Sequence, residues 1–344
     1  MKSYDIKSMT FVELETELSD KNLPAYRIKQ LYEWLHKNSA VSYDAMSNLP
    51  QELRIYFEKN YPLFGCKIMN KQVSQLDETV KYLFELHDGE TIESVLMKYK
   101  YGYTLCISTQ VGCKAGCIFC ATGTSGLIRN LMPSEMLSQI YRAQTDMDVR
   151  ISNVVLMGMG EPLHNYGNVI RFLELVTDLG GLNISMRNIT LSTCGIVPAI
   201  YMLLENRFQL TLSVSLHAPN NEIRTRLMPI NSQYPLEELL VACKEYSLKT
   251  SRRISFEYAL FKGVNDTEEC AKQLAKILKG MHCHLNLIPA NSVVGSTCTG
   301  SDTKAIKAFK DILEEKQLNV TVRRTLGSDI DASCGQLRRR ITET

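Results

Sequence analysis

The chain has 344 residues, 44% of them hydrophobic and 22% charged, a composition that is ordinary for a globular protein. Its net charge is only +2, so no strong overall field draws it to nucleic acid, although local basic runs at residues 323–324 and 338–340 leave room for a basic face. No stretch approaches about eighteen apolar residues, and the first twenty residues mix acids and bases. We therefore expect no membrane span, no targeting segment and a cytoplasmic location.

The first ninety residues predict a small helical module followed by a β connector. Two helical patterns, each with a proline near a helix start, cover residues 10–38 and 42–60. Two β-type patterns joined by the turn signal HDGE follow at residues 78–86 and 90–99, and they predict a β-hairpin. We expect an accessory domain over residues 1–90 and an α/β core over residues 91–344.

From residue 103 onward, apolar strand-like runs alternate with amphipathic helices. The predicted strands are residues 103–109, 152–158, 188–193, 209–216, 254–260, 283–288 and 319–324. Helical periodicity is clear over residues 133–143, 168–176 and 268–280. This alternation predicts a parallel sheet with right-handed crossovers. It indicates a full or partial (β/α) barrel of six or seven units, with an open doubly wound sheet as the alternative.

Segments with unusual polar chemistry come directly after the predicted strands. They are CKAGC at 113–117, GMGEP at 158–162, STCG at 192–195, SLHAP at 215–219 and IPAN at 288–291. In (β/α) barrels the active site is built from loops at the carboxyl ends of the strands. This regularity favours the barrel over the open sheet.

Cys113, Cys117 and Cys120 form a C-x3-C-x2-C pattern after the first core strand, among eleven cysteines in all. Soft thiolate ligands select zinc, copper or iron–sulfur clusters. A structural zinc site usually adds a second cysteine pair or closely spaced histidines, and neither lies nearby. Three ligands on a [4Fe–4S] cluster leave one iron open to a cosubstrate. The alternative is a non-catalytic RNA-binding module with zinc on these thiols and a distant fourth cysteine.

The cysteine spacing resembles the signature of radical S-adenosylmethionine (SAM) enzymes, and most of the chain resembles the RlmN/Cfr family of RNA adenine methyltransferases. The matching stretches run in order from residue 23 to residue 338 and include TLCISTQVGCKAGCIFCATG, VLMGMGEPLHNY, SLHAPNNEIRTRLMPIN and GSDIDASCGQLR. The resemblance implies a partial (β/α)6 radical SAM barrel. It also implies a [4Fe–4S] cluster on Cys113, Cys117 and Cys120, and two SAM molecules per turnover.

The same resemblance assigns the residues that contact SAM. Gly160 and Glu161 match the motif whose backbone and carboxylate contact the SAM amino group. The remaining contacts carried over from the family are Ser192, Ser215, Leu216, His217 and Asn291. Taken alone, the first motif would indicate only a glycine-rich turn, because it lacks the third glycine of a dinucleotide fingerprint. Taken alone, Ser192 would likewise indicate only a hydroxyl at a strand end, and His217 only a turn or core histidine.

Catalytic roles follow from the chemistry of the family. Carbon C2 of adenine is electron-poor and does not attack SAM, so a radical route is required. The resemblance implies that Cys334 is methylated first, because a thiolate is nucleophilic. A radical formed on that methyl group then adds to adenine, Glu93 accepts the ring proton, and Cys106 forms a disulfide with Cys334 to release the product. Without the family, Cys106 would be a core thiol and Glu93 a solvated hairpin residue.

The resemblance implies 23S rRNA and tRNA as substrates and a flavodoxin- or ferredoxin-type electron donor. We also expect a monomer, since the sequence shows no coiled coil or dimer segment. Methylation at C8, which in the Cfr type confers ribosomal antibiotic resistance, is the alternative, and Pro162 favours C2. The helical module is expected to contact RNA; it carries Arg27, Lys29 and Lys37, although such charges more often form a solvated face. The segment ANSVVGSTCTGS, residues 290–301, departs from the family pattern.

Overall fold

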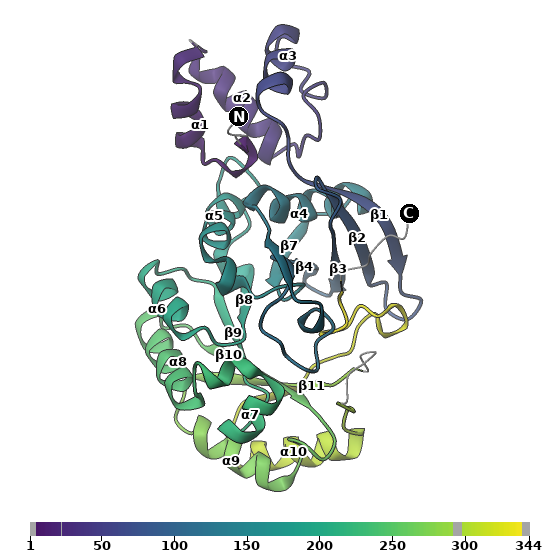
Figure 1. Cartoon of the computed structure of the whole chain (residues 1–344), viewed down its shortest axis with the longest axis vertical. Helices are drawn as coiled ribbons and strands as arrows, with labels where there is room; N and C mark the ends of the chain where they lie inside the picture. The colour runs from purple at the N-terminus through teal and green to yellow at the C-terminus, as the bar shows by residue number, and fades with distance from the viewer. Residues whose placement is uncertain (1–4, 22, 292–297, 339–344) are drawn as a thin grey trace.

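The computed structural model describes residues 5–21, 23–291 and 298–338. Arg339, Arg340 and residues 292–297 of the divergent segment lie outside the described residues. A ten-stranded sheet carries most of the fold, with helices α1 to α3 forming a separate group beside it (Figure 1). Among the described residues, no helix is long and apolar enough to cross a membrane.

The N-terminal module is built from three α-helices and two short 3-10 helices. They are η1 (Ile6–Ser8), α1 (Phe11–Glu17), η2 (Ser19–Lys21), α2 (Ala25–His36) and α3 (Gln51–Asn60). Thr10 and Glu13 form a reciprocal capping box at the start of α1, and Pro24 and Pro50 precede α2 and α3 as predicted. The buried apolar residues of the module, from Ile6 to Tyr61, form a hydrophobic cluster of their own.

The predicted hairpin is confirmed, and it extends the main sheet. Strands β1 (Cys66–Val73), β2 (Val80–Leu86), β3 (Thr91–Tyr99) and β4 (Gly102–Cys106) pair antiparallel in succession. The predicted domain boundary at residue 90 thus falls in the turn between β2 and β3. The boundary between the two hydrophobic clusters lies earlier in the chain, because the module's cluster ends at Tyr61 and the main core begins at Cys66.

Seven strands pair in parallel in chain order, which is the predicted partial barrel. They are β4, β7 (Ile151–Leu156), β8 (Ile189–Thr193), β9 (Thr211–Ser215), β10 (Ile254–Leu260), β11 (Cys283–Pro289) and β12 (Val320–Val322). A doubly wound sheet reverses its strand order at a switch point. The order here never reverses, so every crossover runs the same way and the open-sheet alternative is wrong.

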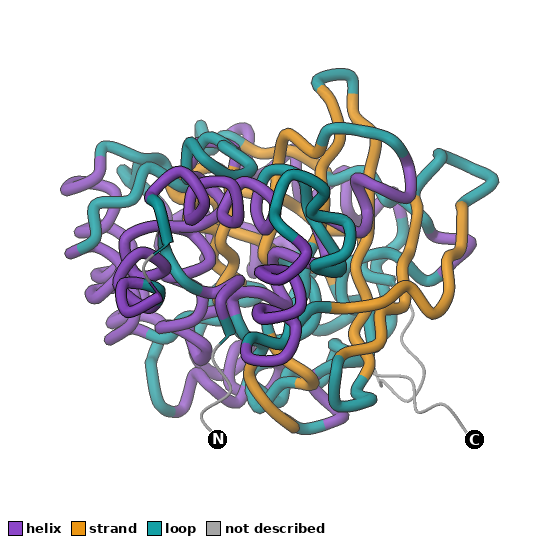
Figure 2. The backbone as a smooth tube through the Cα atoms, turned by 90° about the horizontal axis from the view of Figure 1, so that it is seen from above, coloured by secondary structure: helices purple, strands orange, loops and turns teal. Residues whose placement is uncertain are grey.

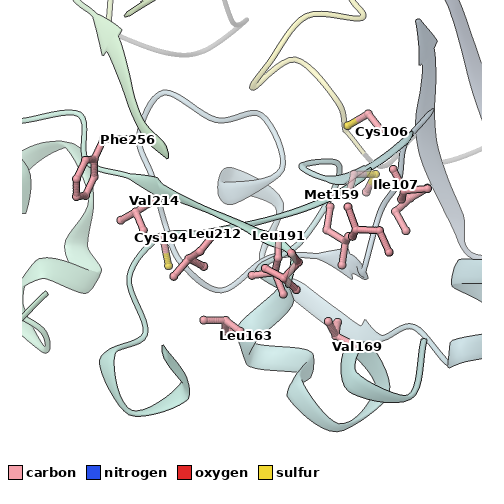
Figure 3. Close-up of a cluster of buried hydrophobic side chains, with 14 of the residues drawn as sticks. Cys106, Ile107, Met159, Leu163, Val169, Leu191, Cys194, Leu212, Val214 and Phe256 are labelled. Carbon is pink, nitrogen blue, oxygen red and sulfur yellow. The ribbon is translucent and has the colours of Figure 1, made fainter. Parts of the chain in front are cut away.

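The crossover helices lie on the outer side of these strands (Figures 1 and 2). They are α4 (Pro133–Met147), α5 (Tyr166–Thr177), α6 (Val197–Glu205), α7 (Asn221–Leu227), α8 (Leu236–Thr250), α9 (Glu268–Leu278) and α10 (Thr303–Glu315). Short 3-10 turns complete the connections: η3 (Gly123–Ser125), η4 (Pro162–Asn165), η5 (Met186–Asn188), η6 (Pro229–Ser232) and η7 (Ser328–Ile330). Part of the core between strands and helices, including Leu191, Leu212 and Val214 from adjacent strands, is drawn in Figure 3.

Candidate active site

Three adjoining cavities open at the carboxyl ends of the barrel strands. The main cavity, of about 980 Å³, reaches from the cysteine loop across β7 to β11. The thiol cavity, of about 460 Å³, lies beside β3 and contains both Cys106 and Cys334. The outer cavity, of about 390 Å³, lies between the ends of β3 and β11 and the C-terminal segment. Cys334 and Arg323 line all three, so these two residues mark the point where the cavities meet.

The three cysteines of the C-x3-C-x2-C loop all line the main cavity. A small two-stranded sheet, β5 (Gln110–Gly112) with β6 (Leu127–Asn130), closes the base of this loop, and the backbone N–H of Cys113 donates to the carbonyl of Gly126 at 2.8 Å. Burial raises the pKa of the Cys113 thiol to about 12 and raises the pKa of Cys117 as well. The chain thus presents three thiols to one space, and burial desolvates two of them, Cys113 and Cys117.

The C-terminal loop that carries Cys334 is attached directly to the cysteine loop. The N–H of Ala121 donates to the carbonyl of Gly335 at 2.8 Å, and the Thr122 hydroxyl donates to the carbonyl of Leu337 at 2.6 Å. These bonds join segments more than two hundred residues apart in the sequence. They hold Cys334 at the edge of the space that Cys120 faces.

Glu161 is a buried carboxylate in the wall of the main cavity, 4% exposed. It accepts hydrogen bonds from the N–H groups of Leu163 at 3.0 Å and Cys194 at 2.7 Å. Burial raises its pKa, and these two N–H groups oppose that shift. Gly160 has a φ of +106°, and a Cβ at this position would lie 2.6 Å from the Cβ of Gln110. Glycine is therefore required where the chain turns toward Glu161.

The other residues assigned to SAM differ in whether they line the main cavity. Ser192, Ser215 and Asn291, from the ends of three strands, line the main cavity as the resemblance implies. Leu216 has a fully buried side chain and is not among the described residues that line the cavity. Its N–H donates to the carbonyl of Glu257 at 3.0 Å, so Leu216 contributes to the loop through its backbone.

His217 lines the main cavity from a strained position at the end of β9, with a φ of +54°. Its Nδ1 accepts from the N–H of Ala259 at 2.9 Å, which leaves the ring proton on Nε2. Burial, aided by the nearby Arg224 guanidinium, lowers its pKa to about 3. The imidazole is therefore neutral at physiological pH and packs edge-on against Phe119, 4.8 Å away.

Cys106 and Cys334 share the thiol cavity as free thiols. Cys106 ends β4 and is 8% exposed, whereas Cys334 is exposed on its loop. Burial, together with the neighbouring Cys334, raises the pKa of Cys106 to about 12. Figure 3 shows the Cys106 side chain at the margin of the buried apolar cluster. The fold thus brings together the two thiols that the resemblance pairs.

Glu93 lies on β3 and is 1% exposed, but it is not among the described residues lining the three cavities. One of its carboxylate oxygens accepts from the backbone N–H of Arg338 at 2.9 Å, and the other lies 3.9 Å from the Lys81 ammonium. The C-terminal segment therefore covers this carboxylate. Glu93 is a buried hairpin residue rather than a solvated one.

Comparison with known proteins identifies the family. The sequence model of the Radical SAM superfamily matches residues 107–274. The chain is 48% identical to a probable dual-specificity RNA methyltransferase RlmN of Lachnoclostridium phytofermentans, over 98% of this chain and 95% of that one, and 50% identical to the one of Lachnospira eligens, over 98% and 97%. The chain belongs to the RlmN family of radical SAM methyltransferases. A radical SAM methyltransferase from Sphaerobacter thermophilus superposes with a TM-score of 0.94 at 42% identity, covering 97% of this chain and 99% of that one.

The site fits the cofactors that the RlmN family implies. Thiolates are the ligands that iron–sulfur clusters take, and three thiols face one cavity. Among the described residues no three His, Cys, Asp or Glu side chains are placed to share a single metal ion, whereas each thiolate of a four-iron cluster binds its own iron atom. The adjoining cavity, with a buried carboxylate and strand-end hydroxyls, has the polar groups that a nucleoside cosubstrate such as SAM requires.

Sequence reasoning missed two charged residues of this RlmN-family site. Glu257 lies inside the buried strand β10, where it accepts from the Ser213 hydroxyl at 2.8 Å and from the Asn286 amide at 2.9 Å. Its other oxygen lies 3.5 Å from the Arg323 guanidinium. A charged residue within the apolar run ISFEYAL was the available signal for Glu257. Arg323 follows the last strand, as the other site residues follow theirs.

Proposed function

We propose that this enzyme places a methyl group on carbon C2 of adenosines in 23S rRNA and tRNA. The proposal rests on one observation above the others: the cysteine loop, the cavity of Glu161 and the Cys106–Cys334 pair adjoin at a single point in a chain of the RlmN family. The relatives named RlmN are described as dual-specificity RNA methyltransferases. That name favours C2 over the C8 alternative.

Each group has a distinct task in this proposal. Cys113, Cys117 and Cys120 hold the [4Fe–4S] cluster, which when bound supplies the electron that cleaves SAM. Glu161, Gly160, Ser192, Ser215, His217 and Asn291 bind and orient SAM, one molecule supplying the methyl group and a second the radical. Leu216 positions the loop before His217 through its backbone. The neutral His217 ring offers an Nε2–H donor without a competing charge.

The two thiols act in turn. Cys334 carries the methyl group, because it is exposed at the junction of all three cavities and so meets both the cofactor side and the outer side. Cys106 lies in the adjoining thiol cavity, where a raised pKa holds it protonated until it is needed. Formation of the Cys106–Cys334 disulfide breaks the bond between the Cys334 sulfur and the bridging carbon on the base. That carbon takes up a proton, replacing the one that the Cys106 thiol loses, and leaves as the methyl group of the product.

Glu93 accepts the proton that leaves the adenine ring. Because its carboxylate is engaged by the N–H of Arg338, this role requires Arg338 to move when RNA binds.

The remaining proposals concern RNA contact, the roles of the two parts of the chain, the electron donor, the location and the oligomeric state. We propose that the N-terminal module contacts RNA, that the functional division into accessory and catalytic parts lies near residue 90, and that a flavodoxin- or ferredoxin-type protein supplies electrons. We further propose a cytoplasmic monomer. Sedimentation of the cluster-loaded protein tests the last point, since a stable dimer would contradict it.

Mass spectrometry of nucleosides tests the central proposal. The anaerobically reconstituted enzyme, supplied with SAM, a low-potential reductant and either 23S rRNA or tRNA, should yield 2-methyladenosine. Peptide analysis of the same protein should find Cys334 as S-methylcysteine. Formation of 8-methyladenosine would favour the alternative, and the absence of any methyladenosine from cluster-loaded protein would contradict the proposal.

A further inference from the structure

The β3–β4 hairpin carries a pair of aromatic rings beside the active site, one partly buried and one exposed. Tyr99 pairs with Gly102 across the hairpin, which leaves Lys100 and Tyr101 as the two turn residues. The rings of Tyr99 and Tyr101 are stacked, with centroids 5.1 Å apart and planes at 4°. Tyr101 is 69% exposed. Two-residue hairpin turns favour asparagine or glycine, so the turn itself gives no reason for an aromatic side chain at this position.

The pair continues into the outer cavity. Tyr99 lines this cavity and packs against the hydrophobic core, so the inner ring is fixed. The opposite wall is formed by Arg323, Arg324 and the loop that carries Cys334. In Figure 1 the C-terminal segment, drawn in yellow, passes beside the lower end of β3. The aromatic stack therefore runs from the methyl-carrying thiol outward to solvent.

The charges around the pair suit a nucleic acid. Lys100 and Arg324 are both exposed, one in the turn and one on the facing segment. Lys98, which precedes Tyr99, is instead paired with Glu78 at 3.0 Å. An aromatic face flanked by cationic side chains is the arrangement by which proteins hold single-stranded nucleic acids, with the base on the ring and the phosphate on the cation.

We propose that Tyr99 and Tyr101 form a stacking platform for the nucleobase next to the target adenosine. The inference rests on the proposed function, which requires the target base to leave its stack before it can reach Cys334. Extrusion exposes one face of the neighbouring base to water. The free face of Tyr101 covers that base, and the existing contact with Tyr99 means that the platform is formed before RNA arrives.

Fluorescence titration with a modified RNA tests the platform. The probe is an RNA hairpin with an adenosine in its loop and 2-aminopurine on one side of it, with a second probe carrying 2-aminopurine on the other side. Cluster-loaded, full-length enzyme without SAM is titrated into each, so that binding is measured without turnover. Stacking on Tyr101 should quench the fluorescence of at least one probe.

Four proteins separate stacking from other effects. Tyr101→Ala should bind the quenched probe roughly 5- to 150-fold more weakly, the loss expected for one base–aromatic stack. Tyr101→Phe keeps the ring and should bind like the wild type. Leu248→Ala, which truncates a side chain 70% exposed on the outer helix α8, should also bind like the wild type. Because Tyr101 is exposed, its variants should retain the wild-type unfolding midpoint.

Several results would overturn the platform. Equal binding by Tyr101→Ala and the wild type would do so, as would an equal loss in Tyr101→Phe and Tyr101→Ala, since that would assign the contact to the hydroxyl. These outcomes are distinct from failure of the proposed function, because the wild-type enzyme would still form 2-methyladenosine in RNA. A wild-type enzyme that methylates no RNA would contradict both the platform and the proposed function.

Discussion

The N-terminal module and the barrel both bury polar groups, but they use them differently. In the module, buried or partly buried polar groups attach it to the barrel. His36 on α2 contacts the Tyr141 hydroxyl on α4 at 3.1 Å, and the Ser134 hydroxyl of α4 donates to Asp5 at 2.6 Å. In the barrel, Glu161, His217 and Glu257 instead converge on a cavity.

The contrast shows that the hydrogen bonds of buried polar groups have a different role in each region. A buried polar group is tolerated only when it is hydrogen-bonded. In the module His36 and Asp5 have partners across the interface, so these bonds serve docking. In the barrel the partners lie within neighbouring strands and loops, so the bonds fix the lining of the site. Changes in the barrel should therefore abolish cofactor binding or activity, and changes in the module should weaken docking.

The largest effect is expected from the cysteine loop. Cys117→Ala removes one of three thiols that face the main cavity, and we expect loss of the iron–sulfur chromophore and of RNA methylation below detection. Cys243→Ala, which removes a buried sulfur from α8, is the matched control and should retain four irons per chain. Iron analysis and visible absorption after anaerobic reconstitution measure both. Full iron content in Cys117→Ala would mean that the loop does not hold the cluster.

A large loss of stability is expected at Arg224 on α7. Its guanidinium is fully buried and donates to the carbonyls of Cys194 at 2.7 Å, Ser215 at 3.1 Å and Leu216 at 3.2 Å. Arg224→Met leaves these acceptors unsatisfied and should lower the free energy of unfolding by about 2–4 kcal/mol. Arg226→Met, on the exposed side of the same helix, should change it by less than about 0.5 kcal/mol. Urea unfolding measures both, and equal effects would contradict the role of Arg224 in fixing the cavity wall.

Docking of the module should depend on pH through His36. Burial lowers its folded-state pKa to about 3, below the roughly 6.5 of an unfolded histidine. Between these values the unfolded chain binds a proton that the folded chain does not. The contribution of His36 to the free energy of unfolding is therefore complete above pH about 6.5. It is lost as the pH falls toward 3, by about 1.4 kcal/mol per pH unit.

The comparison of His36→Gln with the wild type isolates this contribution. The free energy of unfolding is measured by urea unfolding between about pH 4 and 6. Its slope against pH should decrease in the variant by up to the equivalent of one bound proton. Cluster content should be the same in both proteins, because His36 lies in the module. An unchanged slope would show that His36 does not titrate on unfolding.

The smallest effect concerns the ion pair between Glu13 of α1 and Arg171 of α5. The Arg171 guanidinium lowers the pKa of Glu13 to about 2. Its stabilisation is present above the unfolded value and is lost as the pH falls through about 2. Because both groups are partly exposed, Glu13→Gln should cost less than about 1 kcal/mol at neutral pH and low salt. A cost that does not decrease at high salt would rule out an electrostatic origin.

Much of the fold could be predicted because its signals are local. All seven predicted core strands are confirmed, since each is a short apolar run bounded by turn residues. Strand β1 gave no such signal: half of its residues are polar, and one side of it is exposed. It is a strand because β2 supplies hydrogen-bond partners along one edge.

The sequence by itself determined the cysteine loop, because three cysteines within eight residues are held close by the chain alone. It also determined the order of the strands, through the alternation of apolar patterns. Only the tertiary structure decided that Cys106, Cys334 and Arg323 meet at one point, that Arg338 covers Glu93, and that the Tyr101 ring stacks on Tyr99. The physical reason is that side-chain periodicity reports the burial of each segment, whereas contacts between distant segments depend on the sheet order and on how the loops pack.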